Sequence, residues 1–379
     1  MSHRPHLAHG WDGHPAPPDW PPLRPDEVAT VLAAFTDLRG PVRLHWHSPR
    51  PFSAAARVQT TAGEVFVKRH HRRVRTAAAL SEEHAFIAHL RAQGLPVPHV
   101  LTDAQGRTAI ACGDWTYEVH APAAGLDLYR DAPSWTPPTS AAHARAAGAM
   151  LARLHTAAQS YTAPARSTSL LVSSAQLLRS DDLLAAIADA CTVRPGLAAA
   201  LAERDWRHAL APLAEALRTV QPRLAALPVL WTHGDWHVSN LCWNTDGNEA
   251  EVAAILDFGL CAPTFALLDL ATAIERNAIG WLEPDPVRRP VWPEIALGLL
   301  EGYARHRPLD APTRALLTDL LPLIHLEFAL SELEYFHAVL QQPQMADVTW
   351  HGFLLDHHAW FAQPQAQALL TALRGAPNG

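Results

Sequence analysis

Two polar motifs, each placed directly after a short apolar segment, constrain the fold of this chain more than any other feature. The string H-G-D-W-H-V-S-N occupies residues 233–240 and follows the apolar run 229–232. The string D-F-G occupies residues 257–259 and follows the apolar run 252–256. Short apolar runs of this kind predict buried strands, and polar side chains that follow a buried strand lie at the rim of the core. The two motifs therefore predict a polar site that faces a cleft.

The spacing of the polar residues in these motifs indicates phosphoryl transfer. That reaction needs a carboxylate that orients the attacking hydroxyl and accepts its proton, and oxygen ligands that hold Mg²⁺ against the phosphates. Asp235 suits the first role, and Asn240 and Asp257 suit the second. The alternative is a set of ordinary turn residues. It is disfavoured because the spacing and the strand contexts coincide.

A lysine and a glutamate in the first part of the chain predict an independent half of the same site. Residues 64–68 predict a strand that ends on Lys68. In the predicted helix 78–93, Glu83 shares a face with the apolar residues three, four and seven positions further on. A carboxylate that faces a core needs a cation, and kinases pair a strand lysine with a helix glutamate in this way. The alternatives are a solvated strand lysine and a surface glutamate.

Secondary-structure patterns divide the chain into a β-rich part and a helical part. Asp26 is predicted to cap a short first helix. The predicted strands are 42–47, 56–60, 64–68, 98–103, 107–119, 229–232, 241–243 and 252–256. After the helix at 78–93, the predicted helices are 139–158, 174–190, 197–219, 292–305, 311–339 and 353–373.

This order of elements predicts an α+β chain with two unequal lobes. Residues 1–25 are expected to form a poorly ordered arm that is rich in Pro and His. Residues 26–120 are expected to form a nucleotide-binding lobe, and residues 121–379 a larger catalytic and substrate-binding lobe. A cleft between two lobes is a common place for a ligand.

Composition excludes several classes of protein. The formal net charge is −7, from 30 Lys and Arg against 37 Asp and Glu, whereas a general nucleic-acid binder is basic. No apolar stretch is long enough to span a bilayer, and the start of the chain is no secretory signal. The 4 cysteines form no C-x-x-C pair, so neither a zinc knuckle nor a disulfide framework is indicated. We expect a cytoplasmic, bacterial protein, and the sequence indicates no oligomeric state.

Four strings together resemble the aminoglycoside phosphotransferase and choline kinase-type family, a branch of the protein-kinase-like fold. They are the helix-to-loop segment 83–98, the string L-A-R-L-H at 151–155, the H-G-D-x-H-x-x-N loop, and D-L-A at 269–271 after the D-F-G. The resemblance covers about residues 40–275. It implies a bilobal protein-kinase-like fold, ATP and Mg²⁺ as cofactors, and a hydroxyl group as the phosphate acceptor.

The resemblance also assigns roles at the reacting centre. It implies that Asp235 is the catalytic base and that Asn240 and Asp257 bind Mg²⁺. It implies that Lys68 touches the nucleotide phosphates and that Glu83 orients Lys68.

Further residues receive supporting roles from the same resemblance. His233 would brace the catalytic loop, and Asp269 would anchor that loop from a helix start. Adenine would meet backbone groups near Glu118, Val119 and His120. His237 is equally consistent with a residue that lines the cleft and with a packed one.

The sequence departs from the family pattern in two loops. The segment 47–56 contains no glycine, so Ser48 and Ser53 are the hydroxyls available to clamp phosphate. In the catalytic loop, Val238 and Ser239 stand where the family most often has Pro-Gly. We expect these departures to affect phosphate clamping and loop geometry rather than the fold.

The length of one segment favours a small-molecule acceptor. Only nine residues separate Gly259 from Asp269, which is too few for the activation segment of a conventional protein kinase. Glu327 and Glu334 are seven residues apart and share a predicted helix face, which would attract an amine-bearing substrate. The alternative for these two glutamates is a solvated helix face.

Three other functions compete with an ATP- and Mg²⁺-dependent small-molecule kinase. The string H-x-D-x-H at 233–237 is compatible with zinc, but the sequence has no second His/Asp cluster at metallohydrolase spacing. A kinase of protein Ser/Thr and a non-catalytic nucleotide-binding module remain alternatives. Phosphate incorporation into protein separates the protein kinase from the leading hypothesis. ATP consumption separates the non-catalytic module from it.

Overall fold

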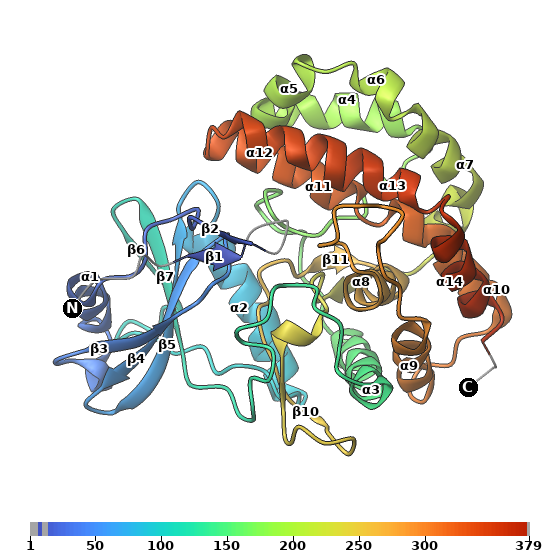
Figure 1. Ribbon diagram of the computed structural model, residues 1–379. Helices are drawn as coiled ribbons and strands as arrows, with labels where there is room; N and C mark the ends of the chain where they lie inside the picture. Colours follow the sequence, from blue (N-terminus) through green and yellow to red (C-terminus); the bar gives the residue numbers. More distant parts are fainter. Residues whose placement is uncertain (1–6, 10–13, 377–379) are drawn as a thin grey trace. The chain divides into compact units, whose positions relative to one another are not determined.

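The computed structural model describes residues 7–9 and 14–376, which form two compact units (Figure 1). The first unit comprises residues 1–136 with two later segments, 239–247 and 252–256. The second unit comprises the remainder of the chain, including residues 137–238 and 257–379. Among the described residues, no helix has both the length and the apolar character needed to cross a membrane.

A five-stranded antiparallel sheet forms the centre of the first unit. Its strands, in spatial order, are β3 (Arg43–His47), β4 (Ala54–Thr60), β5 (Gly63–His71), β7 (Trp115–His120) and β6 (Ala109–Cys112). Val65 and Val67 of β5 are buried on one face, while Phe66 and Lys68 are half-buried on the other. This alternation is the period of two that a strand imposes on its side chains, and it places Lys68 on the face opposite the main core.

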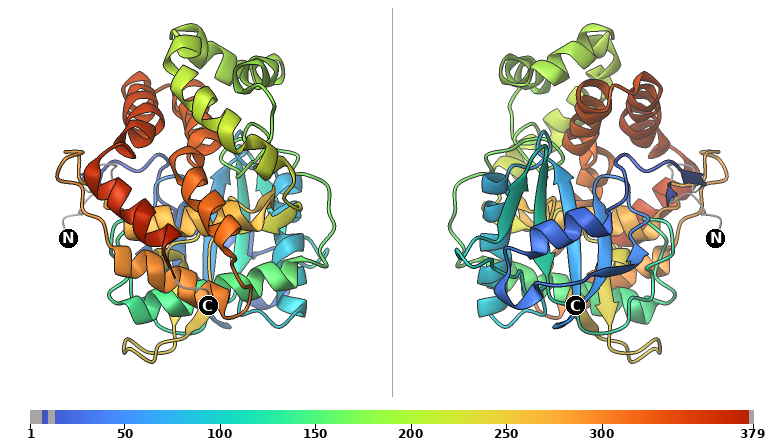
Figure 2. Two further views of the ribbon diagram at one scale, coloured as in Figure 1. Left: turned by 90° about the vertical axis from the view of Figure 1, so that its right-hand side faces the viewer. Right: turned by 90° about the vertical axis from the view of Figure 1, so that its left-hand side faces the viewer.

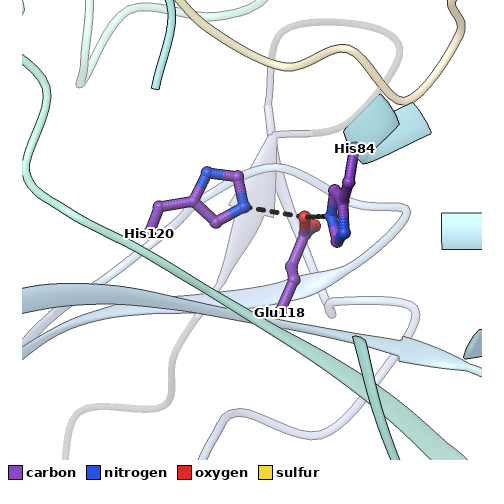
Figure 3. A group of neighbouring side chains, drawn as sticks. All are labelled: His84, Glu118 and His120. Atoms are coloured by element: carbon purple, nitrogen blue, oxygen red, sulfur yellow. Dashed lines mark hydrogen bonds and ion pairs between the residues drawn. The ribbon is translucent and has the colours of Figure 1, made fainter. Parts of the chain in front are cut away.

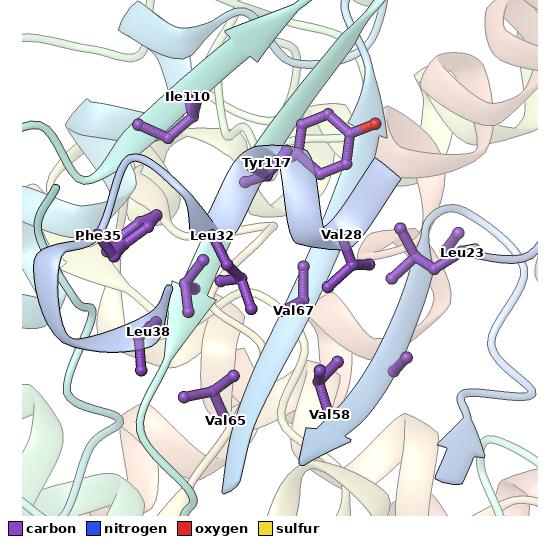
Figure 4. Close-up of a cluster of buried hydrophobic side chains, with 14 residues drawn as sticks. Leu23, Val28, Leu32, Phe35, Leu38, Val58, Val65, Val67, Ile110 and Tyr117 are labelled. Carbon is purple, nitrogen blue, oxygen red and sulfur yellow. The ribbon is translucent and has the colours of Figure 1, made fainter. Parts of the chain in front are cut away.

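The first helix packs its apolar stripe on that core face (Figures 2 and 4). Helix α1 (Pro25–Leu32) buries Val28, Val31 and Leu32 in one cluster with the valines of β4 and β5. Each such side chain contributes about 1.5–3 kcal/mol when it leaves water. This helix and the sheet therefore hold β5 in place, and β5 carries Lys68.

The predicted cap of α1 is wrong by two positions. Arg24, not Asp26, is the N-cap residue, and its backbone N–H donates to the Glu27 carboxylate over 2.8 Å. Pro25 at the first helical position explains the shift, because its fixed φ suits that position and it has no N–H to satisfy. Asp26 lies in the first turn and pairs with the Arg24 side chain instead.

Several described residues of the expected N-terminal arm make contacts within the first unit. Strand β1 (Ala8–His9) pairs with β2 (Pro15–Ala16), and Leu23 is buried in the core. Trp20 stacks on His71 with ring centroids 4.7 Å apart. The other residues of this segment, 1–6 and 10–13, lie outside the described residues.

Helix α2 (Ala77–Ala92) begins at a threonine cap, where Thr76 Oγ accepts the Ala79 N–H over 3.2 Å. Its buried face contains Glu83, as the periodicity predicts, and Glu82 is half-exposed. The predicted strand 98–103 is wrong, because that segment forms only an isolated bridge between Val100 and His120.

The predicted strand 107–119 is two strands, β6 and β7, joined by a turn at Gly113 with φ +60°. The left-handed conformation at Gly113 suits glycine. Two later strands, β9 (Leu241–Trp243) and β10 (Val252–Ile255), pair with each other and belong to the first unit.

The second unit is mainly helical. Its helices are α3 (Ala141–Ala158), α4 (Leu183–Val193), α5 (Pro195–Ala202), α6 (Trp206–Ala209), α7 (Ala211–Ala225), α8 (Ala266–Ala278), α9 (Pro293–Ala304), α10 (Ala311–Leu320), α11 (Leu326–Glu334), α12 (Pro343–Val348), α13 (His357–Trp360) and α14 (Pro364–Arg374). Strands β8 (Leu230–Thr232) and β11 (Ala262–Thr264) form an antiparallel pair. The predicted helix 311–339 is interrupted at 321–323, where Pro322 cannot donate an α-helical hydrogen bond.

Helices α3 and α9 pack closely side by side (Figure 1), and glycines allow this close approach. A Cβ on Gly302 of α9 would collide with the Arg145 carbonyl of α3, and one on Gly148 of α3 would collide with the Leu299 carbonyl of α9.

We expect Gly302→Ala to lower the free energy of unfolding by about 2 kcal/mol, as overpacking does. Gly352→Ala is the matched control, because a Cβ there meets nothing within 4 Å. Urea denaturation measures both, and equal stability of the two variants would contradict this account of the helix contact.

Candidate active site

The loop that carries Asp235 is anchored at its start by helix α8. Asp269, in the first turn of α8, accepts the backbone N–H of His233 over 2.8 Å and that of Gly234 over 2.9 Å. Both N–H groups belong to the turn after β8, where no strand partner satisfies them. A buried carboxylate at a helix N-terminus is favoured by the helix dipole, so α8 fixes the loop through its backbone.

The same helix holds the other end of the loop. Asn277, two turns after Asp269, accepts the Val238 N–H through Oδ1 over 3.0 Å and donates from Nδ2 to the Trp236 carbonyl over 3.0 Å. Positions 269, 276 and 277 share one helix face because they are seven and eight residues apart. The backbone of the loop at 233–238 therefore lies along α8.

Asp235 lies between these anchors and pairs with a buried arginine. The Arg276 guanidinium, also from α8, forms an ion pair with Asp235 Oδ1, and His237 Nε2 lies 3.5 Å from the same oxygen. Burial lowers the pKa of Arg276 to about 10, with the charge of Glu332 opposing the shift, so the guanidinium is still charged at neutral pH. The side chain of Asp235 retains 17% exposure, which leaves the carboxylate reachable by solvent.

Two features shape the loop around Asp235. The His233 ring is fully buried against Trp236 and Phe258, with ring centroids 5.3 and 4.8 Å away, and its Nδ1 accepts the Asp235 N–H over 3.2 Å. Gly234 has φ +80°, and a Cβ there would lie 2.7 Å from the Leu260 carbonyl. Only glycine meets both the conformation and the close approach.

A buried relay supports Asp269. His155 Nε2 donates to Asp269 over 3.0 Å, and the Tyr303 hydroxyl donates to His155 Nδ1 over 2.8 Å. Burial alone would raise the pKa of Asp269, but the hydrogen bond and charge of His155 and the charge and N–H of His233 outweigh it and lower the pKa. Asp269 is thus an ionised acceptor for the loop.

The D-F-G segment joins directly to the element that anchors the loop. Asp257 has φ +52° and is half-exposed, and the Gly259 N–H approaches its Oδ1 at 3.4 Å. Phe258 is buried against His233. The residues between Gly259 and Asp269 form β11 and the start of α8, so no long activation loop intervenes.

The first unit holds seven of the predicted site residues, among them Asn240, Lys68 and Glu83. Asn240 ends a short 3₁₀ turn (Val238–Asn240), is largely buried, and accepts the Leu256 N–H at its carbonyl over 2.7 Å. Lys68 pairs in register with Glu118 across β5 and β7. Glu83 is 3% exposed on α2.

The loop between β3 and β4 uses one of its two serines for its own turn. Ser48 is buried, and its Oγ accepts the Arg50 N–H over 3.2 Å. Ser53 is half-buried at the end of the loop. Arg50 donates to Ser134 Oγ over 2.9 Å, so this glycine-free loop is held by side-chain contacts.

The side chains of Glu118 and His120 are engaged with other histidines of the first unit. His84 and His120 each donate to Glu118 Oε2, over 2.8 and 2.7 Å (Figure 3), and His70 donates to Oε1 over 2.9 Å. Burial alone would raise the pKa of Glu118, but His120 above all, with His70 and His84, holds it well below its usual range. In the backbone, the Val119 carbonyl already accepts the Leu101 N–H over 2.8 Å.

Neither Glu327 nor Glu334 lies on a solvated helix face, so that alternative is wrong. Glu327 is buried and accepts the N–H groups of Leu177 and Leu178 over 2.9 and 3.2 Å. Glu334 pairs with Arg194 over 2.6 Å. These contacts favour a structural role for both glutamates over substrate binding.

Glu275, beside Arg276 on α8, forms a buried pair that the sequence does not suggest. Burial raises the pKa of Glu275 to about 8, so the carboxyl is largely protonated at neutral pH, and its Oε1 lies 3.1 Å from His357 Nε2. His357 in turn stacks on Trp281 with ring centroids 3.3 Å apart. A protonated acid beside a neutral imidazole buries no charge.

His325 predicts a pH dependence of stability. Burial lowers its pKa from 6.5 to about 4, although its Nε2–H donates to the Leu354 carbonyl over 3.0 Å. Between pH 6.5 and 4, His325 is therefore protonated in the unfolded chain and neutral in the folded chain. The free energy of unfolding consequently falls as pH falls through that window. Wild type should lose about 3 kcal/mol relative to His325→Gln between pH 7 and 4, measured by denaturant titrations. Parallel profiles for the two proteins would contradict the shift.

Sequence reasoning assigned no specific contacts to Arg276, Asn277 and His155, which the structure joins to the loop at 233–238 and to Asp269. The signal for the first two was available in the spacing of α8, since they fall two turns after Asp269 on the same face. His155 lies in the string L-A-R-L-H, but its contact with Asp269 joins positions far apart in the chain. No local pattern predicts that contact.

A protein-family model and several solved structures are similar to this chain. A family model described as the phosphotransferase enzyme family matches residues 51–316. No curated protein matches the chain in sequence. Among solved structures, a microcompartment-associated aminopropanol kinase is similar, with 15% identity, a TM-score of 0.61, and coverage of 93% of this chain and 99% of that chain.

Two further structures have the same fold. An amicoumacin kinase in complex with AMP-PNP, Ca²⁺ and Ami has 14% identity and a TM-score of 0.58, covering 94% of this chain and 95% of that chain. A spectinomycin phosphotransferase in complex with ADP and its antibiotic has 10% identity and a TM-score of 0.53, covering 94% and 99%. These likenesses confirm the expected α+β, protein-kinase-like fold.

Proposed function

The chain belongs to the phosphotransferase enzyme family. On that premise we propose that it is a small-molecule kinase that transfers the γ-phosphoryl group of ATP to a hydroxyl of an amine-bearing alcohol. One observation carries the proposal. Asp235 lies on a loop that α8 anchors at both ends, through Asp269 and Asn277, and Arg276 of the same helix holds its carboxylate. An oriented, ionised carboxylate with some exposure is what a kinase base requires.

In the proposed reaction, the acceptor hydroxyl donates a hydrogen bond to Asp235. As the hydroxyl oxygen forms a bond to the γ-phosphorus, the bond between that phosphorus and the oxygen of ADP breaks, and the hydroxyl proton passes to Asp235. Arg276 acts as a positioning residue, because its ion pair fixes the direction of the Asp235 carboxylate.

The donor chemistry of Asn240 and Asp257 fits Mg²⁺, which prefers carboxylate and amide oxygens. We propose that these two residues hold the ion and that Lys68, oriented by Glu83, holds the nucleotide phosphates. When bound, Mg²⁺ neutralises charge on the transferring phosphoryl group. This assignment rests on the H-x-D-x-x-x-x-N and D-F-G spacing, and it makes residues 26–120 the nucleotide-binding part of the chain and residues 121–379 the catalytic part.

Two observations support a small, amine-bearing acceptor. The segment between Gly259 and Asp269 is occupied by β11 and the start of α8, so the chain lacks room there for the platform on which protein kinases bind peptides. Structures of the same fold include an aminopropanol kinase, whose substrate name describes an amino alcohol. With Glu327 and Glu334 engaged in structural contacts, the recognition of the amine falls to other residues.

A coupled assay of ADP release over a panel of acceptors tests the proposal. The panel holds amino alcohols, aminoglycosides, amino sugars and their amine-free analogues, each assayed with ATP and Mg²⁺. We expect turnover with an amine-bearing alcohol and little with its amine-free analogue. Equal turnover of both members of a pair would refute the amine requirement, and ADP release only with protein acceptors would refute a small-molecule substrate. ATP binding without turnover on any acceptor would favour a regulatory module.

A further inference from the structure

A cluster of three histidines around one glutamate lies on the sheet face opposite α1. His70 comes from β5, Glu118 and His120 come from β7, and His84 comes from α2. All four side chains belong to the first unit, and three of them are at least 94% buried. His120, at the end of β7, is the partly exposed member. None of them has a role in the proposed transfer through its side chain.

We propose that His84, Glu118 and His120 form a binding site for a divalent transition metal of the zinc type, with His70 holding the other carboxylate oxygen of Glu118. In each imidazole it is Nε2 that points at the Glu118 carboxylate, at 2.7 to 2.9 Å. The ligand atoms of His84, Glu118 and His120 all lie within 4.8 Å of one another, as Figure 3 shows for the three side chains.

These distances are close to those of a tetrahedral site. Bonds of about 2.0–2.1 Å from zinc to nitrogen and oxygen place tetrahedral ligand atoms roughly 3.3 Å apart. The observed N–O distances of 2.7 and 2.8 Å at Glu118 Oε2 need to open by about 0.5 Å. Rotation of the side chains of Glu118 and His120 supplies such a change without backbone movement. His84, Glu118 and His120 therefore need little reorganisation to bind a metal.

The chemistry of the ligands selects the class of ion. Imidazole nitrogen with one carboxylate suits Zn²⁺ and related transition metals. Mg²⁺ and Ca²⁺ take oxygen ligands, so this site is distinct from the nucleotide-associated ion proposed above. A buried carboxylate needs a cation or a metal, and the three hydrogen bonds described at Glu118 all come from imidazoles.

The His84 ring is free to adopt the tautomer that a metal requires. Its Nε2 donates to Glu118, so the proton lies on that nitrogen in the hydrogen-bonded form. Within the described part of the chain, the buried Nδ1 has no hydrogen-bond partner. The second nitrogen decides which tautomer a histidine adopts. Because nothing fixes Nδ1, the proton can move there and leave the Nε2 lone pair for the ion.

Cobalt binding to the full-length, chelator-treated protein tests the site, because Co²⁺ in a tetrahedral nitrogen and oxygen site absorbs visible light. We expect wild type to show a saturable absorption band that one equivalent of Zn²⁺ abolishes. His84→Ala and Glu118→Gln should lose this component, with affinity at least tenfold weaker. His45→Ala is the matched control, because His45 pairs with Glu64 on β5 at 2.7 Å and is not part of the cluster. It should bind as wild type does.

A second measurement covers variants that fail to fold. His120 lies at the edge of the cluster with 13% side-chain exposure, so His120→Asn is expected to fold, and its unfolding midpoint can be followed with and without Zn²⁺. We expect Zn²⁺ to raise the midpoint of wild type and of His45→Ala, but not that of His120→Asn. The proposal is overturned if wild type shows no zinc-displaceable band, or if the cluster variants bind Co²⁺ as tightly as His45→Ala. These readouts do not depend on kinase activity, so they stand apart from the proposed function.

Discussion

Replacement of Asp235 by asparagine should lower kcat by about 10²–10⁴-fold, the usual contribution of a general base, while ATP binding stays within a factor of about two of wild type. The amide keeps the shape of the side chain but cannot accept the hydroxyl proton. It also removes the charge that Arg276 pairs with. Stopped-assay kinetics with the best acceptor and calorimetry with ATP measure the two quantities.

The control for this variant is an Asp→Asn change on the surface of the same unit. Asp347 pairs with Arg204 and retains 62% side-chain exposure, so Asp347→Asn should leave both kcat and ATP affinity unchanged. Circular dichroism shows whether Asp235→Asn is folded. A folded Asp235→Asn protein with wild-type kcat would show that another group accepts the proton.

Replacement of Asp257 by asparagine should remove most of the Mg²⁺-dependent part of nucleotide affinity. Loss of an outer-shell partner of a metal already costs roughly 10–100-fold in affinity, and loss of a charged ligand should cost at least as much. Asparagine is the better substitution here because Asp257 has φ +52°, a conformation that asparagine tolerates and alanine disfavours. Calorimetric titration of ATP at several Mg²⁺ concentrations measures the effect.

Asp257→Ala provides the comparison that separates metal binding from backbone strain. Both variants should lose the Mg²⁺-dependent part of ATP affinity. The alanine variant should also have a free energy of unfolding that is about 1 kcal/mol lower, measured by denaturant titration. If Asp257→Asn binds ATP with the same Mg²⁺ dependence as wild type, Asp257 is no metal ligand. Weak binding only in the alanine variant would indicate strain rather than ligation.

The elements that carry the polar motifs could be predicted because their signals are local. A two-residue alternation defines β5, and a stripe at three and four residues defines the buried face of α2 with Glu83. The motifs at 233–240 and 257–259 follow β8 and β10, as their apolar runs predict. The prediction of the first helix cap failed because two local signals competed, a proline at the first helical position and an aspartate suited to the cap. Pro25 displaced the cap from Asp26 to Arg24.

The contacts that complete the site could not be predicted because they join distant positions. His155 meets Asp269 across 114 residues, and Glu118 meets His70 across 48. The second contact depends on the register of β5 against β7, in which Lys68 lies opposite Glu118 and His70 opposite Thr116. The helical period of α8 would have revealed Arg276 and Asn277 once Asp269 was chosen. Glu327 was predicted to share a helix face with Glu334. Its backbone partners at 177 and 178 are about 150 residues away in the chain and could not be predicted.

The fate of the γ-phosphate tests the central claim most directly. ATP labelled at the γ-phosphate is incubated with Mg²⁺, the protein, a mixture of amine-bearing alcohols and a protein extract, and the label is followed by chromatography and mass spectrometry. The account predicts that label moves to the hydroxyl of an amine-bearing small molecule with wild type and not with Asp235→Asn. Label that appears in protein instead, or that moves equally well with Asp235→Asn, would contradict it.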